Sequence, residues 1–126
     1  AFKDPDYYGH LADSAAYIQA IRKTDRYIAD IWNYIQSNPN YKDKTTLLVT
    51  NDHGRHLDGV ADGYISHGDN CEGCRHIELF ALSPDFKRQV QVNVPYDQLD
   101  ISATISEMLH FPFYKGKGTV MKELFK

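Results

Sequence analysis

Residues 45–54 read TTLLVTNDHG, a run of β-branched and apolar residues that leads directly into a charged pair and a glycine. The run is apolar on consecutive positions and does not alternate, which is typical of a strand buried on both faces of a parallel sheet. In open α/β proteins, ligands bind beyond the carboxyl ends of such strands. The stretch therefore predicts a parallel α/β layer with Asp52 and His53 at its ligand-binding edge.

Helical and extended segments surround this strand. Apolar residues recur mostly at spacings of three, four and seven over residues 14–36, which predicts an amphipathic helix capped by Asp13 or Ser14. Spacing and turn residues predict four further elements: a strand over 77–82, an edge strand over 89–94, and helices over 100–109 and 120–125. Residues 55–75 are rich in Gly, Asp, His and Asn and predict a long functional loop.

The composition limits the class of protein. A chain of 126 residues has the size of one domain, and its net charge of -3 offers no basic surface for nucleic acid. No apolar run approaches the ~20 residues of a membrane-spanning helix. Cys71 and Cys74 are too few for a disulfide scaffold and too few for a structural zinc site, which needs four ligands. They fit a local disulfide or two free thiols.

Histidine and aspartate lie close together in the sequence at three places: Asp6 with His10, Asp52 with His53, and His67 with Asp69. Imidazole and carboxylate both offer a lone pair at neutral pH and form the ligand set of zinc and similar divalent ions. Taken singly, the first pair also fits a helix cap beside a surface histidine, and His67 alone is a weak signal. Taken together, the pairs predict a metal site.

Three segments resemble the nucleotide pyrophosphatase/phosphodiesterases: DPDYYGH at 4–10, TNDHG at 50–54, and HGDN at 67–70 with the F-A-x-x-P that ends at Pro84. Three others are similar to segments of sulfatases: CEGCRHIELFALSP at 71–84, LDISATISEMLHF at 99–111 and GKGTVMKELF at 116–125. The resemblance covers essentially the whole chain. It indicates the C-terminal part of the alkaline phosphatase superfamily, which includes phosphodiesterases, sulfatases and metal-dependent phosphomutases.

The resemblance implies a fold and a domain organisation. Residues 1–126 would form part of a mostly parallel three-layer α/β sandwich of the alkaline phosphatase/sulfatase type. They would be one unit, the C-terminal portion of a larger catalytic domain whose N-terminal half lies outside this sequence. The start at Ala1, without an initiator methionine, agrees with this expectation. An exported, periplasmic or extracellular location is also what the resemblance implies.

The resemblance further implies two divalent metal ions, zinc first, with manganese or magnesium as alternatives. Asp6, His10 and His67 would bind one ion, and Asp52 and His53 the other. The family's nucleophilic Thr or Ser comes from the N-terminal half, so no catalytic nucleophile is expected in this chain, and the chain alone should be inactive. Hydrolysis would proceed through a covalent intermediate on that hydroxyl, with the two ions stabilising the attacking and leaving oxygens.

The substrate is expected to be a phosphate or sulfate ester. Arg55, His56 and Arg75 flank the proposed ligands and, as cations, would bind such an anion or else form paired surface charges. Sulfatases carry a lysine at the place of His67 and mostly oxygen ligands around one calcium, so the histidines favour a phosphodiesterase or phosphatase. A phosphomutase, a sulfatase and a non-catalytic α/β module are the alternatives.

Overall fold

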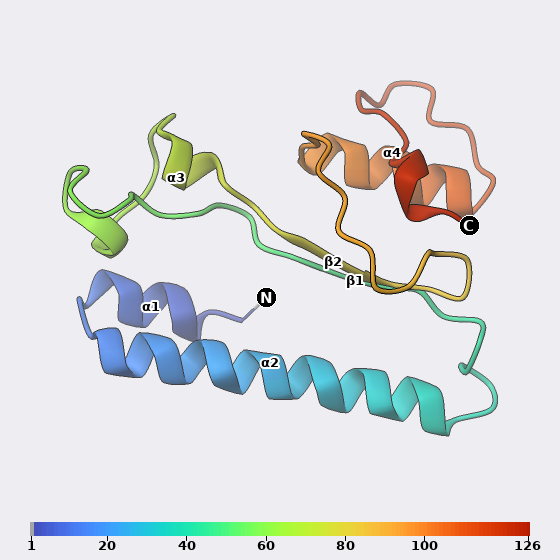
Figure 1. The fold of residues 1–126 in the computed structure, drawn as a ribbon, viewed down its shortest axis with the longest axis horizontal. Coiled ribbons are helices and arrows are strands. Elements are labelled where there is room, and N and C mark those ends of the chain that lie inside the picture. The colour runs from blue at the N-terminus through green and yellow to red at the C-terminus, as the bar shows by residue number, and fades with distance from the viewer. Residues whose placement is uncertain (1) are drawn as a thin grey trace.

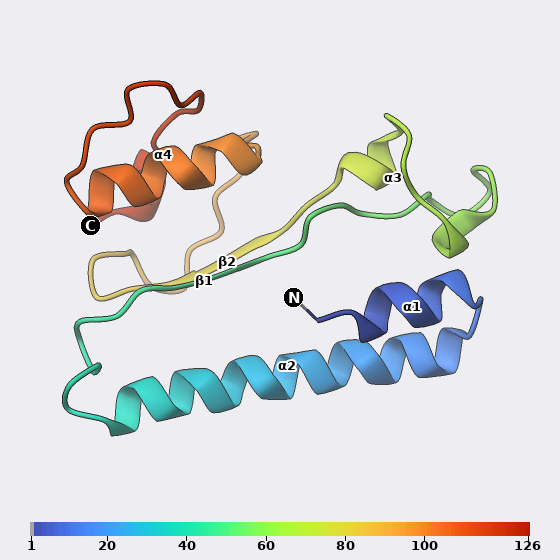
Figure 2. The same ribbon diagram turned by 180° about the vertical axis from the view of Figure 1, so that it is seen from behind.

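The computed structural model describes residues 2–126. Its elements, in chain order, are α1 (Asp4–His10), α2 (Ser14–Ser37), β1 (Leu47–Thr50), the 3-10 turn η1 (Gly63–Ile65), α3 (Glu72–Arg75), β2 (Leu79–Leu82), α4 (Gln98–Met108) and the 3-10 turn η2 (Lys122–Leu124). The β1–β2 ribbon runs through the middle of the molecule, with α1 and α2 on one side and α4 on the other (Figure 1). The view from behind shows the same arrangement (Figure 2).

The two strands pair antiparallel, with Leu47 opposite Leu82 and Thr50 opposite Leu79. The parallel pairing predicted for this region is therefore wrong for β1 and β2, and residues 2–126 show a two-stranded ribbon where a three-layer parallel sandwich was expected. An unbroken apolar run indicates a buried strand, and burial does not fix its direction. Residues 51–78 connect the end of β1 to the start of β2 on the same side of the ribbon. Parallel pairing would need a connection that crosses to the opposite end of β1.

The N-terminal helices place two of the predicted ligands. α2 begins as predicted, because the Asp13 side chain accepts a hydrogen bond from the Ala16 amide at 2.9 Å. α1 was not predicted; it has Pro5 in its first turn, where proline is tolerated, and it packs against α2. Its helical spacing puts Asp6 and His10 one turn apart on the same face.

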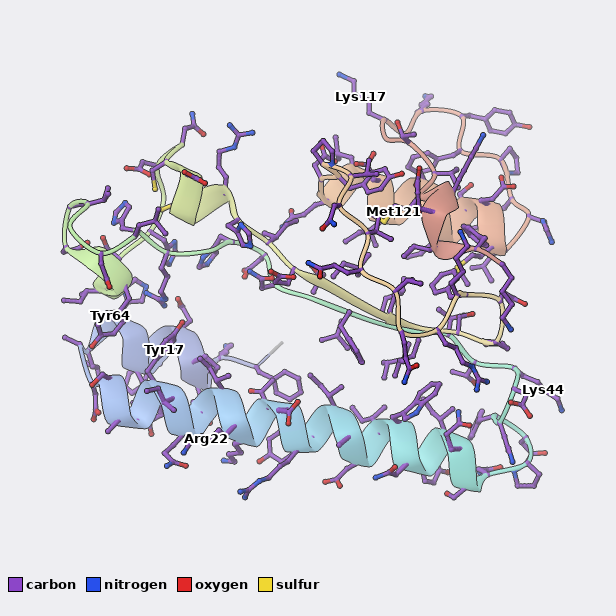
Figure 3. The ribbon with its side chains drawn as sticks, viewed as in Figure 1. Tyr17, Arg22, Lys44, Tyr64, Lys117 and Met121 are labelled. Carbon is purple, nitrogen blue, oxygen red and sulfur yellow. The ribbon has the colours of Figure 1, made fainter. Side chains whose placement is uncertain are left out.

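Much of the apolar stripe of α2 faces solvent. Ala20 and Ile35 are the buried residues of this helix, whereas Ile18, Ile21 and Ile31 are exposed. Figure 3 shows side chains on both sides of α2, with Tyr17 directed toward α1 and Arg22 directed away from the rest of the chain. Core packing among residues 2–126 thus holds only part of the stripe that the sequence predicts.

The C-terminal part is organised around α4, which confirms the predicted helix. Asp97 and Asp100 form a capping box at its start. The buried Asp100 and Thr104 accept hydrogen bonds from the amides of Thr119 (2.6 Å) and Met121 (3.0 Å), which fastens the last segment to the helix. The helix predicted over 120–125 is reduced to η2, and no strand forms over 89–94 in the described structure.

A cavity of about 720 Å³ lies beside β2 and the segment that follows it, and its lining includes Trp32, Phe80, Val90 and Met121 but no histidine. It is therefore separate from the predicted metal site. Among the described residues, none of the helices combines the length and the apolar character that crossing a bilayer requires.

Candidate metal centre

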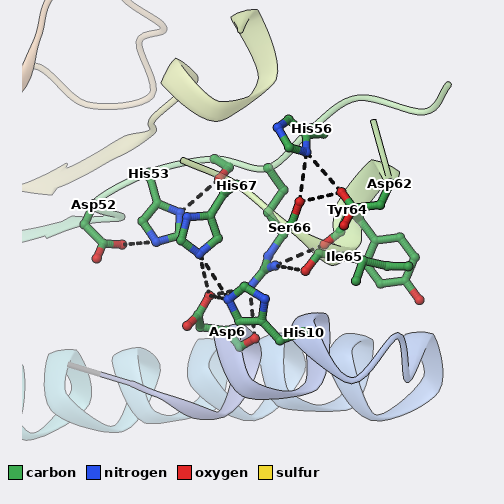
Figure 4. Close-up of polar contacts among 12 residues, drawn as sticks. Asp6, His10, Asp52, His53, His56, Asp62, Tyr64, Ile65, Ser66 and His67 are labelled. Atoms are coloured by element: carbon green, nitrogen blue, oxygen red, sulfur yellow. Dashed lines mark hydrogen bonds and ion pairs between the residues drawn. The ribbon is translucent and has the colours of Figure 1, made fainter. Parts of the chain in front are cut away.

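Three predicted ligands from distant segments meet at one point of the structure. His10 Nε2 lies 3.2 Å from His67 Nε2, although 57 residues separate the two histidines. Asp6 Oδ1 lies 3.5 Å from His10 Nε2 and 3.4 Å from His67 Nε2. Figure 4 shows the three side chains pointing toward one another from α1 and from the loop above it. The structure thus brings these residues together, and their role as metal ligands stays a prediction.

The separations suit a common ion. Zinc–nitrogen and zinc–oxygen bonds of ~2.0–2.2 Å in tetrahedral geometry place neighbouring ligand atoms about 3.3–3.5 Å apart. Two imidazoles and a carboxylate match zinc or manganese better than calcium, which prefers oxygen ligands throughout. The Asp6 and His10 side chains are 49% and 46% exposed, so the group is open on one side. Three protein ligands with an open side are typical of a catalytic metal site.

His53 joins this group from the end of β1. Its ring stacks on His67 with centroids 3.6 Å apart, and its Nδ1 lies 2.9 Å from the Gly54 carbonyl oxygen. A carbonyl only accepts hydrogen bonds, so Nδ1 carries the proton and Nε2 keeps its lone pair. The carboxylate of Asp52 lies 3.7 Å from that Nε2 and is well exposed. His53, predicted with Asp52 to bind a second ion, thus offers a ligand atom within 4.8 Å of those of Asp6 and His67, and Asp52 lies beside His53 (Figure 4).

We call Asp6, His10, His53 and His67 the histidine cluster. Burial lowers the pKa of His67 below its ordinary value, and the neighbouring imidazole of His53 lowers this pKa further, against the opposing effect of Asp6. His67 is consequently neutral at pH 7. Neutral imidazole is the form that binds a metal ion.

Arg55, predicted to contact substrate, is used inside the protein. Its side chain is 9% exposed, and its guanidinium pairs with the Asp6 carboxylate. It also donates to the Asp6 backbone oxygen at 2.9 Å and to two carbonyl oxygens of η1 at 3.1 Å each. Gly9 makes room for it, because a Cβ at that position would overlap the guanidinium. Arg55 thereby ties α1 to the loop that carries His67, so we treat it as a positioning residue.

The other two predicted substrate contacts lie elsewhere. His56 is buried, and its Nδ1 lies 3.2 Å from Asp62 Oδ1 and 3.2 Å from Ser66 Oγ. It is grouped with those residues and not with His10 and His67 (Figure 4). Arg75 is exposed at the end of α3. A direct role of His56 in substrate binding does not fit its burial.

Comparison with known protein families identifies the family of this chain. The sulfatase family model matches residues 2–111, a stretch that contains the whole histidine cluster. The chain belongs to the sulfatase family. It is therefore a member of the alkaline phosphatase/sulfatase superfamily, whose members are typically metal-dependent hydrolases. Neither the comparison with curated proteins nor the comparison with solved structures gave a match.

This sulfatase-family chain carries a second group of metal-ligating side chains, which sequence reasoning missed. His56, Asp69, Cys71 and Cys74 offer ligand atoms that all lie within 4.8 Å of one another, and we call them the cysteine cluster. The Cys71 thiol donates a hydrogen bond to Asp69, which lowers the pKa of Asp69 to about 2 and raises the pKa of Cys71 to about 11. The CxxC spacing was the available signal, and the fold supplies the two ligands that it lacked.

Proposed function

We propose that this chain is the metal-binding C-terminal part of a two-metal phosphoester hydrolase of the phosphodiesterase or phosphatase type. The convergence of His10 Nε2, His67 Nε2 and Asp6 Oδ1 within 3.5 Å of one another is the observation that carries the proposal. Membership of the sulfatase family supports hydrolase chemistry in general. The choice of a phosphate ester rests on the imidazole ligands, which suit zinc or manganese.

Asp6, His10 and His67 would hold one ion, and Asp52 and His53 would hold the second. Ions bound there supply Lewis-acid stabilisation of negative charge on the ester oxygens and favour ionisation of the attacking oxygen. A Thr or Ser hydroxyl outside these residues, in an N-terminal half, would be the nucleophile and form the covalent intermediate. The ester and that half of the protein are thus the partners in this proposal.

The contribution of this chain is to position the ligands. Arg55 fixes Asp6 relative to η1 through its hydrogen bonds and ion pair. Stacking on His67 orients the His53 ring, and the bond to the Gly54 carbonyl sets its tautomer. Both effects reduce the reorganisation needed before an anionic substrate is bound.

Sulfate ester hydrolysis is the second candidate function, favoured by membership of the sulfatase family. In the sulfatase arrangement, mostly oxygen ligands surround one calcium ion, and a lysine stands where this chain has His67. The two candidates therefore differ in the metal ion that the site prefers, calcium or zinc, and in the ester that it binds, sulfate or phosphate.

Calorimetry on the 126-residue chain with Cys71→Ser and Cys74→Ser, which removes the thiols as competing ligands, tests the proposal. We expect zinc or manganese to bind more tightly than calcium, and acidification through the imidazole range to release the ion. The zinc-loaded chain should bind inorganic phosphate more tightly than sulfate. Asp6→Asn should weaken zinc binding by at least about tenfold, whereas Asp4→Asn, a matched change in the same helix, should not.

Preference for calcium over zinc would contradict the two-metal phosphoesterase and favour the sulfatase. Tighter binding of sulfate than phosphate would lead to the same conclusion. Equal loss of zinc affinity in Asp4→Asn and Asp6→Asn would show that helix α1, and not the Asp6 carboxylate, is what the substitutions disturb.

A further inference from the structure

The cysteine cluster lies near the histidine cluster in the chain but shares no residue with it. His56 comes from the segment that follows β1, Asp69 and Cys71 come from the turn that leads into α3, and Cys74 lies within α3. The donors are one imidazole, one carboxylate and two sulfurs. Four donors of these types complete a tetrahedral structural zinc site, and two cysteines separated by two residues are a common spacing in such sites.

His56 has the orientation of a metal-ligating histidine. Its Nδ1 lies 3.2 Å from Oδ1 of Asp62, and a carboxylate can only accept, so Nδ1 carries the proton. Its Nε2 then presents a lone pair toward Asp69. Histidines that bind metals almost always donate their other nitrogen to a carboxylate or carbonyl in this way. Ser66 donates to the same Asp62 oxygen and holds the carboxylate in place.

The Nε2 atom of His56 is buried and has no hydrogen-bond partner in the described structure, and the side chain as a whole is only 7% exposed. Asp69 Oδ2 lies 3.2 Å from it but outside hydrogen-bonding geometry. Leaving a buried polar atom unsatisfied costs on the order of 1–3 kcal/mol. A cation between the imidazole, the carboxylate and the sulfurs would satisfy this atom.

Local hydrogen bonds shape the turn that carries the two cysteines. Asp69 Oδ1 accepts from the Cys71 amide at 2.9 Å, and Cys71 Sγ accepts from the Cys74 amide at 3.3 Å. Asp69 therefore uses one oxygen within the turn and turns the other toward His56.

The turn also packs directly against the segment that carries His56. The Gly54 amide donates to the Cys74 carbonyl at 2.8 Å. Any Cβ on Gly73 would overlap the Arg55 carbonyl oxygen, so the close approach of the two segments requires glycine there. The four donors are thus held together by backbone contacts that do not involve the donors themselves.

We propose that His56, Asp69, Cys71 and Cys74 bind one zinc-type divalent ion as a structural site, with Asp62 orienting His56. Binding replaces two S–H bonds by two sulfur–metal bonds and releases both protons to solvent. No electron is transferred. The inference is independent of the proposed function, because the cysteine cluster would bind its ion whether the histidine cluster holds zinc or calcium.

The ion would act on the geometry of the neighbouring cluster. His56 follows His53 by three positions, and Asp69 follows His67 by two. Fixing His56 to Asp69 therefore fixes the two segments that bring His53 against His67.

Cobalt(II) added to the reduced 126-residue chain is the probe, because thiolate ligation gives a sulfur-to-cobalt charge-transfer band that nitrogen and oxygen ligands do not give. We expect the intensity of the band to correspond to one thiolate-bound cobalt per chain and the band to disappear when zinc is added. Cys71→Ser with Cys74→Ser should abolish it. Glu72→Gln, a change in the same turn, should leave it intact, and so should Asp6→Asn in the histidine cluster.

The role of His56 is read from His56→Gln, which should weaken cobalt binding by at least about tenfold, with the exposed His76→Gln as its matched control. Should His56→Gln unfold the chain, the wild-type spectrum and the cysteine variant decide the question. Absence of the band in the reduced wild-type chain would overturn the site. Isolation of the chain with a Cys71–Cys74 disulfide that persists in mild reductant and excess zinc would overturn it as well.

Discussion

The histidine cluster and the cysteine cluster are built in opposite ways. The former joins side chains of α1 to His53 and His67, which lie far along the chain, and its Asp6 and His10 are nearly half exposed. The latter is drawn from residues 56–74 alone; its His56 is almost fully buried and its Cys74 is buried, whereas its Asp69 side chain is more than half exposed. Three protein ligands with an open side suit an ion that must also meet a substrate, whereas four protein ligands suit an ion that holds the chain together.

The difference also concerns what each cluster depends on. The histidine cluster requires α1 to be docked, and Arg55 makes that connection. The cysteine cluster requires only a turn seated on the segment next to it. Removing support for α1 should therefore weaken metal binding at the histidine cluster and leave the cysteine cluster intact.

The largest expected effect is protection of residues 54–75 by zinc. An ion present at about 100 times its dissociation constant stabilises the bound state by about 2.7 kcal/mol, which slows exchange of the amides it protects by about 100-fold. Hydrogen exchange with and without a chelator measures this, with the amides of α4 as the internal reference. Equal slowing in α4, or none in residues 54–75, would remove the structural role assigned to the cysteine cluster.

A smaller effect is expected from Arg55→Lys. Lysine keeps the charge but cannot reach Asp6 and both η1 carbonyls at once, so α1 loosens. Zinc affinity at the histidine cluster should fall by at least about tenfold, and the cobalt band of the cysteine cluster should keep its intensity. Lys23→Arg, which alters a weaker ion pair with Asp4 in the same region, is the control. Equal losses at both clusters would show that they are not separable.

The pH dependence of zinc binding should differ between the clusters by about tenfold per pH unit. Hydrogen bonding to Asp69 raises the pKa of Cys71 to about 11, so binding between pH 7 and 8 must release at least that proton, and affinity rises with pH. The lowered pKa of His67 means that this imidazole is already neutral there, so its protonation contributes little to the affinity of the histidine cluster between pH 7 and 8. Calorimetric zinc titrations of variants that keep only one of the two clusters, in buffers of different ionisation enthalpy, give the number of protons released on binding. A flat profile at the cysteine cluster would argue against thiolate ligands.

Much of the local structure follows from sequence pattern. Asp13 caps α2 as predicted, and the apolar run before Asp52 forms β1. The direction of β2 relative to β1 could not be derived, because both directions bury the same residues. α1 escaped prediction because its seven residues are too few to show an apolar period.

The histidine cluster was predictable because its residues fall in motifs that resemble a known family. The roles of Arg55 and His56 could not be predicted from the sequence. A charged residue beside a motif can equally contact the substrate or position another residue. Only the fold shows that Arg55 reaches Asp6 and that His56 completes the ligands of Cys71 and Cys74.

The β1–β2 ribbon has a consequence for how the chain behaves in concentrated solution. Each strand has four residues and a single neighbour within residues 2–126, so the outer edge of each carries peptide groups without a strand partner. Such edges are templates on which another extended segment can add, in either direction, by main-chain hydrogen bonding. Phe80 of β2 is about half exposed, so self-association through this ribbon should reduce the solubility of the chain.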